Sequence, residues 1–368
     1  MSYQVYVSLQ NEDCIRRLAF DRNSGALEKK AEYEAKGGPA PMCLSPDGRV
    51  IHVGFRGDRP ENSPGSNGGV LPEHGLGSFA IDGCGDLHPI GRVHNEGEPC
   101  FVRTDHSGHF LLSAHPQVGR VATHGIDASG AVAGPAIEWI ATHCGAHSVQ
   151  IDSSNRFAFV PHIGEGNGGL KRLGSSAANA IFQFRFDDKT GRLTPNNPPR
   201  TGPGQDLQWG PRHSCWHPAQ PWLYVVNEQG NSISRYTMDG ERGTLSLNET
   251  VDTLPPQGHP GKTSTADIQM HPSGRFLYAP NRGHDTITSY RVDQVSGRLS
   301  HPVWTRADAH PRAFMLDPSG HFLLCAGMTA GRLTAYGIDQ AEGTLTELQS
   351  VHCGRVPMWV LITELPGA

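Results

Sequence analysis

The sequence predicts an all-β protein folded as a seven-bladed β-propeller. Three observations lead to this prediction: glycine and proline are abundant, a glycine-containing turn recurs seven times, and a two-stranded hairpin recurs six times. Of the 368 residues, 45 are Gly and 28 are Pro, and only 18% are charged. In a chain without low-complexity segments, this composition favours many turns and short strands.

The recurring turn consists of Gly, any residue, and then Leu or Val. Successive copies lie 45 to 61 residues apart and begin at Gly25, Gly85, Gly130, Gly191, Gly243, Gly297 and Gly343. Each copy is expected to lead into a short outer strand. A period near 50 residues corresponds to about four strands per unit, which is typical of a propeller blade.

The recurring hairpin pairs two apolar strands around a tight turn. Its copies span residues 41–55, 99–115, 147–162, 211–226, 266–283 and 311–327. In the fourth copy the strands are predicted at Pro211–Trp216 and Trp222–Val226. The turns contain sequences such as Pro46-Asp47-Gly48, whose residue types favour chain reversal.

Six hairpins against seven turns indicate that one blade is completed by both ends of the chain. The N-terminal "YQVYVSL" matches the second strand of a hairpin whose first strand is missing, and "PMWVLITEL" near the C-terminus matches that first strand. We therefore expect residues 355–362 to close the ring in blade one. Residues 1–368 are expected to form a single domain. The alternative is a pair of β-sandwiches in which the spacing arises by chance.

Charge and cysteine content narrow the classes of function. The net charge is −5 and no basic run is present, so nothing indicates binding to nucleic acid or to an anionic membrane surface. The N-terminus lacks a basic segment followed by a long apolar one, so no signal peptide is expected. Eight scattered cysteines without a CxxC pair indicate reduced thiols and a cytoplasmic protein. The sequence predicts no oligomeric state.

The propeller register brings polar residues together at one mouth of the central channel. The first strand of each blade lines the channel and the second runs back, so the start of one and the end of the other share a rim. The strand starts supply His147, Arg212, His213, Asp267, Arg312 and, for blade one, Arg355; the strand ends supply Arg56, His115, His162, Glu228 and Arg282. His217 and His271 are expected in turns at the opposite rim. Taken alone, each polar residue could be a surface ion pair or a hydrogen-bonded histidine.

Two long segments follow second strands and are therefore expected at the same charged rim. They are residues 57–77 and 164–179, both rich in Gly, Ser and Asn. That composition is typical of lids over a site. Neutral surface insertions are the alternative.

Several motifs resemble those of a known family. "AHSVQIDSSNRFAFVP", "PRHSCWHP", "LYVVNE" and "HPSGRFLYAPNRGHDTI" are similar to the seven-bladed propeller lactonases, which include the propeller type of 6-phosphogluconolactonase and the fungal carboxy-cis,cis-muconate cyclase. The resemblance covers essentially the whole chain. It implies a catalytic set of His147, Arg212, Glu228 and Arg282. The other rim residues expected to bind substrate are His162, His213, Asp267, Arg312, His115 and Arg56.

The sequence departs from the family pattern around the mouth. His162 in "VPHIG" stands where Asp is usual, and "AHP" at Ala114–Pro116 replaces the family's "ANY". The substrate therefore need not be the family's phosphorylated one.

The residue types at the mouth suit the hydrolysis of a lactone, a cyclic ester. A base must activate water and a cation must stabilise the oxyanion. His147 and Glu228 are the candidate bases, and Arg212 and Arg282 the candidate cations. No GxSxG nucleophile motif is present. We therefore expect a lactonase that opens a small anionic sugar-type lactone without a cofactor.

Three alternatives remain open. The same residues could run a lactonising cycloisomerase reaction on a dicarboxylate. A binding scaffold is a second alternative, although WD-type repeats are absent. A divalent metal ion held by Glu228, Asn227, Asn281 and Asp267 is a third, although their spacing is not that of a strong ligand set.

Overall fold

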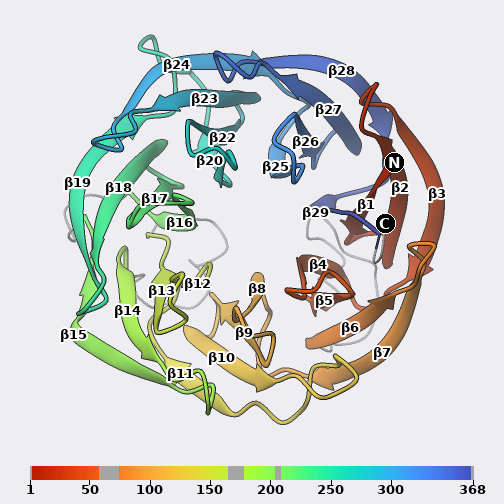
Figure 1. Ribbon diagram of the computed structural model, residues 1–368, viewed down its shortest axis with the longest axis vertical. Coiled ribbons are helices and arrows are strands. Elements are labelled where there is room, and N and C mark those ends of the chain that lie inside the picture. The colour runs from red at the N-terminus through yellow and green to blue at the C-terminus, as the bar shows by residue number, and fades with distance from the viewer. Residues whose placement is uncertain (1, 58–73, 165–177, 204–208, 366–368) are drawn as a thin grey trace.

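The computed structural model is a ring of seven antiparallel sheets around a central channel (Figure 1). It describes residues 2–57, 74–164, 178–203 and 209–365, and none of these lies in a helix. The strands nearest the axis are short, and the outermost strands wrap the rim of the disc. The predicted all-β propeller with seven blades is therefore confirmed.

Each blade is a four-stranded meander running outward from the channel. The strands of the first four blades are β29 (Pro357–Thr363), β1 (Ser2–Leu9), β2 (Cys14–Asp21), β3 (Leu27–Glu34); β4 (Pro39–Leu44), β5 (Val50–Phe55), β6 (Gly75–Ile81), β7 (Leu87–His94); β8 (Phe101–Thr104), β9 (Phe110–His115), β10 (Arg120–Gly125), β11 (Glu138–Ala141); and β12 (Gln150–Ile151), β13 (Phe157–Pro161), β14 (Ile181–Phe186), β15 (Leu193–Thr201).

The remaining three blades have the same order. Their strands are β16 (Pro211–Trp216), β17 (Trp222–Asn227), β18 (Ser232–Asp239), β19 (Thr244–Asp252); β20 (Ser264–Thr265), β21 (Gln269–Met270), β22 (Phe276–Arg282), β23 (Thr286–Val292), β24 (Leu299–Arg306); and β25 (Pro311–Leu316), β26 (Phe322–Gly327), β27 (Arg332–Ile338), β28 (Leu345–His352). Blade six has an extra strand because its inner strand is interrupted between β20 and β21.

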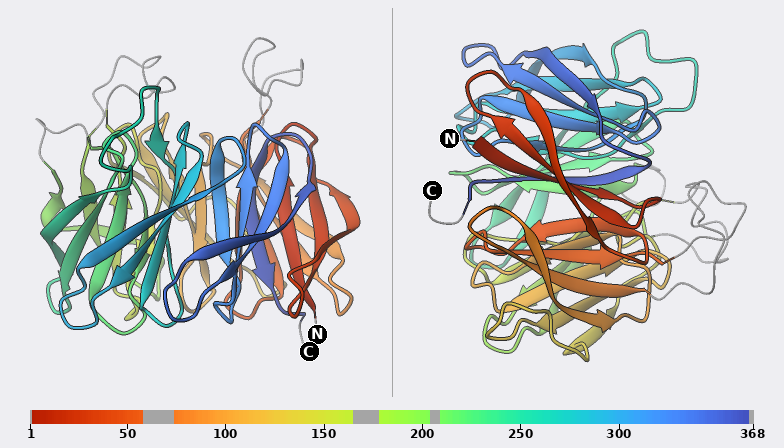
Figure 2. Two further views of the ribbon diagram at one scale, coloured as in Figure 1. Left: turned by 90° about the horizontal axis from the view of Figure 1, so that it is seen from above. Right: turned by 90° about the vertical axis from the view of Figure 1, so that its right-hand side faces the viewer.

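The ring closes through strand β29, which pairs antiparallel with β1. The register runs from Gln4 opposite Thr363 to Leu9 opposite Pro357. The start of β1 and the end of β29 therefore lie side by side at one face of the disc (Figure 2). The closure predicted for residues 355–362 is confirmed, with the strand itself beginning at Pro357.

Apolar contacts between neighbouring blades hold the ring together. Trp222 and Val226 of blade five, for example, pack in one buried cluster with Leu277 and Tyr290 of blade six. The recurring turn takes part in these contacts, because the hydroxyl of Tyr224 donates to the carbonyl of Gly297 in the next blade at 2.7 Å. Tyrosine hydroxyls bind the turn carbonyls of Gly85 and Gly343 in the same way, so these turns fix adjacent blades to one another as well as reversing the chain.

The inner strands of blades four to seven lose their regular pairing near the charged mouth. His147 lies between an isolated bridge and β12, and Asp267 lies between β20 and β21. A register shift in β16 falls at Arg212 and His213, and one in β25 falls at Arg312. Irregular pairing re-aims side chains that regular alternation would send to opposite faces. It therefore lets adjacent residues such as Arg212 and His213 both enter the charged site.

No helix in the part of the chain that the structure describes is long and apolar enough to span a lipid bilayer.

Candidate active site

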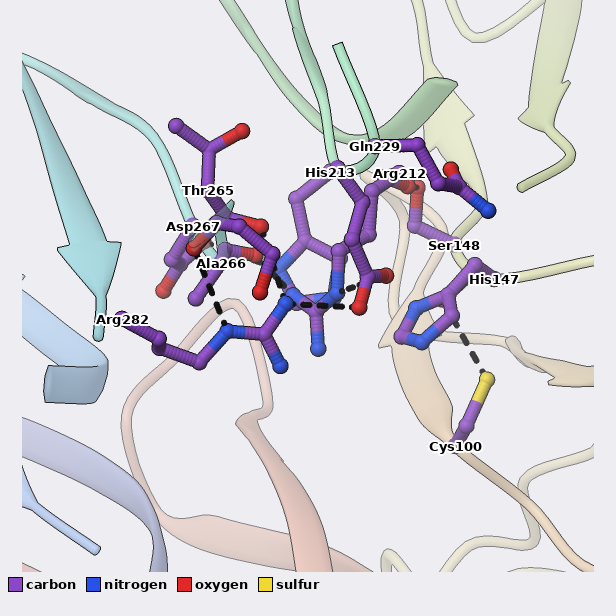
Figure 3. Close-up of polar contacts among 12 residues, drawn as sticks. Cys100, His147, Ser148, Arg212, His213, Gln229, Thr265, Ala266, Asp267 and Arg282 are labelled. Carbon is purple, nitrogen blue, oxygen red and sulfur yellow. Dashed lines mark hydrogen bonds and ion pairs between the residues drawn. The ribbon is translucent and has the colours of Figure 1, made fainter. Parts of the chain in front are cut away.

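Two arginines share one glutamate at the charged mouth of the channel. Arg212 Nε lies 3.1 Å from Glu228 Oε2, and Arg282 Nη2 lies 2.6 Å from Glu228 Oε1. Strand order explains this arrangement: Arg212 begins β16, Glu228 follows its partner strand β17, and Arg282 ends β22. All three side chains are buried. The predicted meeting of these three residues is what the structure shows. Figure 3 labels Arg212 and Arg282 of this group.

Backbone carbonyls of blade six fix the two guanidinium groups further. Arg212 donates to the carbonyl of Ala266, and Arg282 donates to the carbonyl of Thr265 at 3.0 Å. Thr265 ends β20, and Ala266 begins the interruption of the inner strand of blade six. The arginines are thus held before any substrate arrives, which suits a preorganised electrostatic site.

The two arginines keep Glu228 ionised. Burial alone would raise its pKa, but the charges of Arg282 and Arg212 outweigh burial and lower it to about 2. A carboxylate with so low a pKa accepts a proton poorly at neutral pH. Its role in this arrangement is therefore to hold the arginines, and the predicted role of Glu228 as a base is not favoured.

Two histidines lie next to the arginines. The rings of His147 and His213 are 5.3 Å apart between centroids. Burial, followed by the charge of Arg212, lowers the pKa of His147 well below 6.5 and that of His213 to about 4. Both imidazoles are therefore neutral at pH 7 and carry a lone pair.

His213 is bound by Asp267, whereas His147 has no such partner. His213 Nδ1 lies 2.9 Å from Asp267 Oδ1. His213 Nε2 and His147 Nδ1 are both buried and have no hydrogen-bond partner among the residues that the structure describes. Figure 3 shows Arg282 and His147 reaching into the group from opposite sides.

Arg312 adds a third cation to the same mouth. Burial and the charges of Arg212 and Arg282 lower its pKa well below the ordinary value, so it lies close to both. It makes no hydrogen bond or ion pair with any residue in the described part of the chain. Among the described residues, the three arginines of this cluster face the carboxylates of Glu228 and Asp267, which leaves one positive charge in excess.

Arg56 and His310 lie at the edge of this cluster. Arg56 is close enough to influence Arg312 and forms an ion pair with Glu98. His310, which the sequence did not single out, lies near Arg282 and Arg312, whose charges add to burial in lowering its pKa to about 4. Its position directly before Pro311, the first residue of β25, was the available signal.

The structure places His115 and His162 outside the cluster. His115 Nε2 lies 2.9 Å from Ser113 Oγ and its ring packs against Trp139. His162 Nε2 lies 2.9 Å from Thr142 Oγ1. Both rings therefore point into the sheets and not into the channel. Successive side chains of a strand face opposite sides, and the position of a residue at a strand end does not decide which side it faces.

Arg355, His217 and His271 also lie away from the cluster. Arg355 is exposed and its backbone N–H donates to Glu12. His217 and His271 sit in the turns predicted for them, and His271 Nε2 lies 2.7 Å from the carbonyl of Gly320.

Residues 58–73 and 165–177 of the two predicted insertions lie outside the described residues, and the first insertion was predicted too long, because residues 75–77 belong to β6. The described residues beside them meet the charged mouth: Gln229, next to Glu228, donates to the carbonyl of Gly164 at 2.7 Å. His74 Nδ1 lies 3.0 Å from the carbonyl of Arg56.

A cavity of about 920 Å³ occupies the channel on the other side of the cluster. His213, Asp267, Phe101 and Trp359 line its inner end. The ring of His213 packs against both aromatic side chains, with centroids 5.4 and 5.7 Å away. Arg212, Arg282 and Arg312 do not line this cavity, whereas Arg103 does.

The four residues considered above as possible metal ligands each contact a different partner. The amides of Asn227 and Asn281 donate to Ser234 and Thr288 of their own blades. Glu228 faces two arginines and Asp267 faces His213. Among the described residues, three side chains with ligand spacing occur together at Glu12, Cys14 and Glu32, where Arg16 binds both carboxylates.

Comparison with known proteins identifies the family of the chain. The family model described as Lactonase, 7-bladed beta-propeller matches residues 4–362. The chain belongs to this family. A 6-phosphogluconolactonase of Serratia proteamaculans is 30% identical over 340 residues, which are 92% of this chain and 93% of that protein. A 6-phosphogluconolactonase of Yersinia pestis is 29% identical and covers 98% of both chains.

Solved structures show the same fold. The periplasmic gluconolactonase of Pseudomonas aeruginosa superposes with a TM-score of 0.86 at 24% identity, covering 100% of both chains. At this level of identity the similarity concerns the architecture.

Proposed function

We propose that this propeller lactonase hydrolyses a sugar-type lactone of the 6-phosphogluconolactone class to the open hydroxy acid. The observation that carries the proposal is the buried Arg212–Glu228–Arg282 group with neutral imidazoles beside it. The names of the relatives at about 30% identity support the same substrate class.

The arginines are suited to the charge that develops on the lactone carbonyl oxygen. When water attacks the carbonyl carbon, this oxygen becomes an oxyanion, and fixed cations in a desolvated site stabilise it. Arg282 and Arg212 are already oriented by Glu228 and by backbone carbonyls. Little reorganisation is needed at the moment of reaction.

An imidazole is the base that this cluster offers. Both carboxylate oxygens of Glu228 contact arginines, and its pKa of about 2 lies below that of His213, about 4. His147 and His213 are neutral at pH 7 and each has a buried ring nitrogen without a partner. Either nitrogen could take a proton from water without a prior change of charge.

Arg312 supports an anionic substrate. It lies beside the other two arginines, and no described carboxylate forms an ion pair with it, although the charge of Glu228 acts on it. A phosphate group on the sugar would supply the balancing negative charge. Guanidinium groups readily form hydrogen bonds to phosphate oxygens.

The remaining features fit the same proposal. All eight cysteines are free thiols, which supports the predicted cytoplasmic location. The proposed chemistry needs no cofactor, since the residues present supply both the base and the cations. No observation favours the cycloisomerase or the binding scaffold over hydrolysis.

The test is steady-state hydrolysis of 6-phospho-D-glucono-1,5-lactone and D-glucono-1,5-lactone, followed with a pH indicator and corrected for the uncatalysed rate. We expect the wild type to open the phosphorylated lactone with and without a chelator. Arg282→Lys should reduce kcat/KM at least tenfold, because lysine cannot reproduce the two-point contacts of a guanidinium group. A wild-type rate equal to the uncatalysed rate on both lactones would refute the proposal.

A further inference from the structure

A histidine–aspartate pair lies beside the arginines without holding them. His213 Nδ1 lies 2.9 Å from Asp267 Oδ1, and the same oxygen accepts the backbone N–H of Ile268 at 2.9 Å. Asp267 is thereby anchored in the interruption of the inner strand of blade six. Since a carboxylate oxygen accepts, His213 carries its hydrogen on Nδ1 and its lone pair on Nε2.

The lone pair of His213 has no described partner although it is buried. The side chain is only 4% exposed, and Nε2 makes no hydrogen bond with the described residues. Buried polar atoms are nearly always hydrogen-bonded, so an unpaired one in a site requires an explanation. The neighbouring ring of His147 has an unpaired buried Nδ1 of its own, 5.3 Å away between ring centroids.

We infer that His213 is the base that takes the proton from the attacking water, and that Asp267 is the residue that positions it. One water molecule held between the rings of His147 and His213 would satisfy both unpaired nitrogens. The inference rests on the proposed function and identifies the proton acceptor within it.

The two histidines differ in how they are held. Asp267 fixes the tautomer and orientation of His213, which is the arrangement expected of a general base with a second group behind it. The ring of His147 makes no hydrogen bond within the described chain. His147 is therefore assigned to binding the water, and His213 to accepting its proton.

In the inferred reaction one proton moves from water to His213 and then to the ring oxygen of the lactone. Water oxygen forms a bond with the lactone carbonyl carbon while its proton moves to His213 Nε2, and the carbonyl electrons pass to the oxygen near the arginines. The electrons return, the bond from this carbon to the ring oxygen breaks, and the proton on His213 moves to the leaving ring oxygen. The product is the hydroxy acid, whose carboxyl group then releases its own proton to solvent.

The experiment compares His213→Gln and Asp267→Asn with the wild type on 6-phospho-D-glucono-1,5-lactone. Both variants should lower kcat by about 10² to 10⁴-fold, the usual loss for a general base. KM should change less than threefold, because the arginines remain. His52→Gln is the matched control: His52 is also buried and bonded to one side chain, Ser78 Oγ, in blade two. It should keep the wild-type kcat.

The pH profile separates catalysis from structure. The charged and titratable groups around His213 are Arg212 and Arg312, which lower its pKa, Asp267, which raises it, and His147. The wild-type kcat should be constant near pH 7 and fall as the pH drops toward about 4. Without the charge of Asp267 the imidazolium is less stable, so Asp267→Asn should move this fall to lower pH.

The outcomes are distinguishable. If the wild type turns over no lactone, the proposed function fails. If the wild type is active but both variants keep kcat within fivefold, or Asp267→Asn lowers only the melting temperature and leaves the acid limb in place, the assignment of His213 is overturned. If His213→Gln does not fold, the kcat and acid limb of Asp267→Asn decide.

Discussion

Glu228 holds the two arginines of the site together, since its carboxylate forms ion pairs with both Arg212 and Arg282. Sequence register predicted that these three residues would meet, because strand starts and strand ends share a rim. It could not show that the two cations would depress the pKa of the carboxylate. That result depends on distances and burial, which the order of residues does not contain.

Replacing Glu228 with Gln should lower stability at neutral pH. The folded-state pKa of Glu228 is depressed, so its contribution is fully present above its ordinary value near 4.5 and is lost as the pH falls through about 2. The shift corresponds to about 3 kcal/mol. Urea denaturation should therefore show a large difference between wild type and Glu228→Gln at pH 7 and a small one near pH 2. Equal differences at both pH values would contradict this account.

Arg312 should control the preference for a phosphorylated substrate. Arg312→Gln removes a guanidinium group that has no described partner, so the fold should be little affected. Losing a hydrogen bond to a charged group costs about 1.5–3 kcal/mol, or roughly 10- to 150-fold in affinity. KM for 6-phospho-D-glucono-1,5-lactone should rise by that factor and KM for the unphosphorylated lactone should rise much less. An equal rise for both would assign Arg312 to the lactone ring instead.

At the scale of single elements, the recurring turn could be predicted from the sequence, whereas the irregular pairing of the inner strands could not. The turns were predictable because each needs a residue with a left-handed backbone, and glycine adopts that conformation without strain. The interruptions of the inner strands were not, because a bulge depends on how two strands pair. His115 and His162 show the consequence: they end second strands as predicted, yet face the sheets and not the channel.

The turn in blade five provides a direct test. Gly243 has a φ of +67°, and a Cβ there would lie 2.0 Å from Cδ1 of Phe157 in blade four. Gly243→Ala should therefore cost about 2–4 kcal/mol, from the left-handed backbone and from overpacking. Gly240, in the same turn, has nothing within 4 Å of its Cβ position, so Gly240→Ala is the control. Thermal unfolding should separate the two, and equal melting temperatures would show that the turn does not clamp the blades.

At the scale of the whole molecule, the ring depends on a single strand. The mismatch between six hairpins and seven turns predicted the closure, because each blade of a propeller needs about four strands. The channel between the two rims was less predictable. No sequence pattern indicates that Phe101, His213 and Trp359 would pack together across three blades.

A chain ending at Gly354 should not fold stably. It loses β29, whose Met358, Val360, Leu361 and Ile362 are buried. At about 1.5–3 kcal/mol for each side chain, the loss is roughly 6–12 kcal/mol, comparable with the whole stability of a typical domain. A chain ending at Glu364 keeps β29 and is the control. Calorimetry should show a cooperative transition for the longer chain only, and two equal transitions would disprove the dependence on β29.

The pairing of β1 with β29 has a consequence for biosynthesis. The ribosome releases β1 first and β29 last, so blade one cannot be completed until translation has passed all the other blades. At about 5–20 residues per second, 368 residues take roughly 20–70 s. Throughout that time the inner edge of β1 can pair with strands of other chains. The yield of active protein should therefore depend on translation speed and on chaperones that cover this edge.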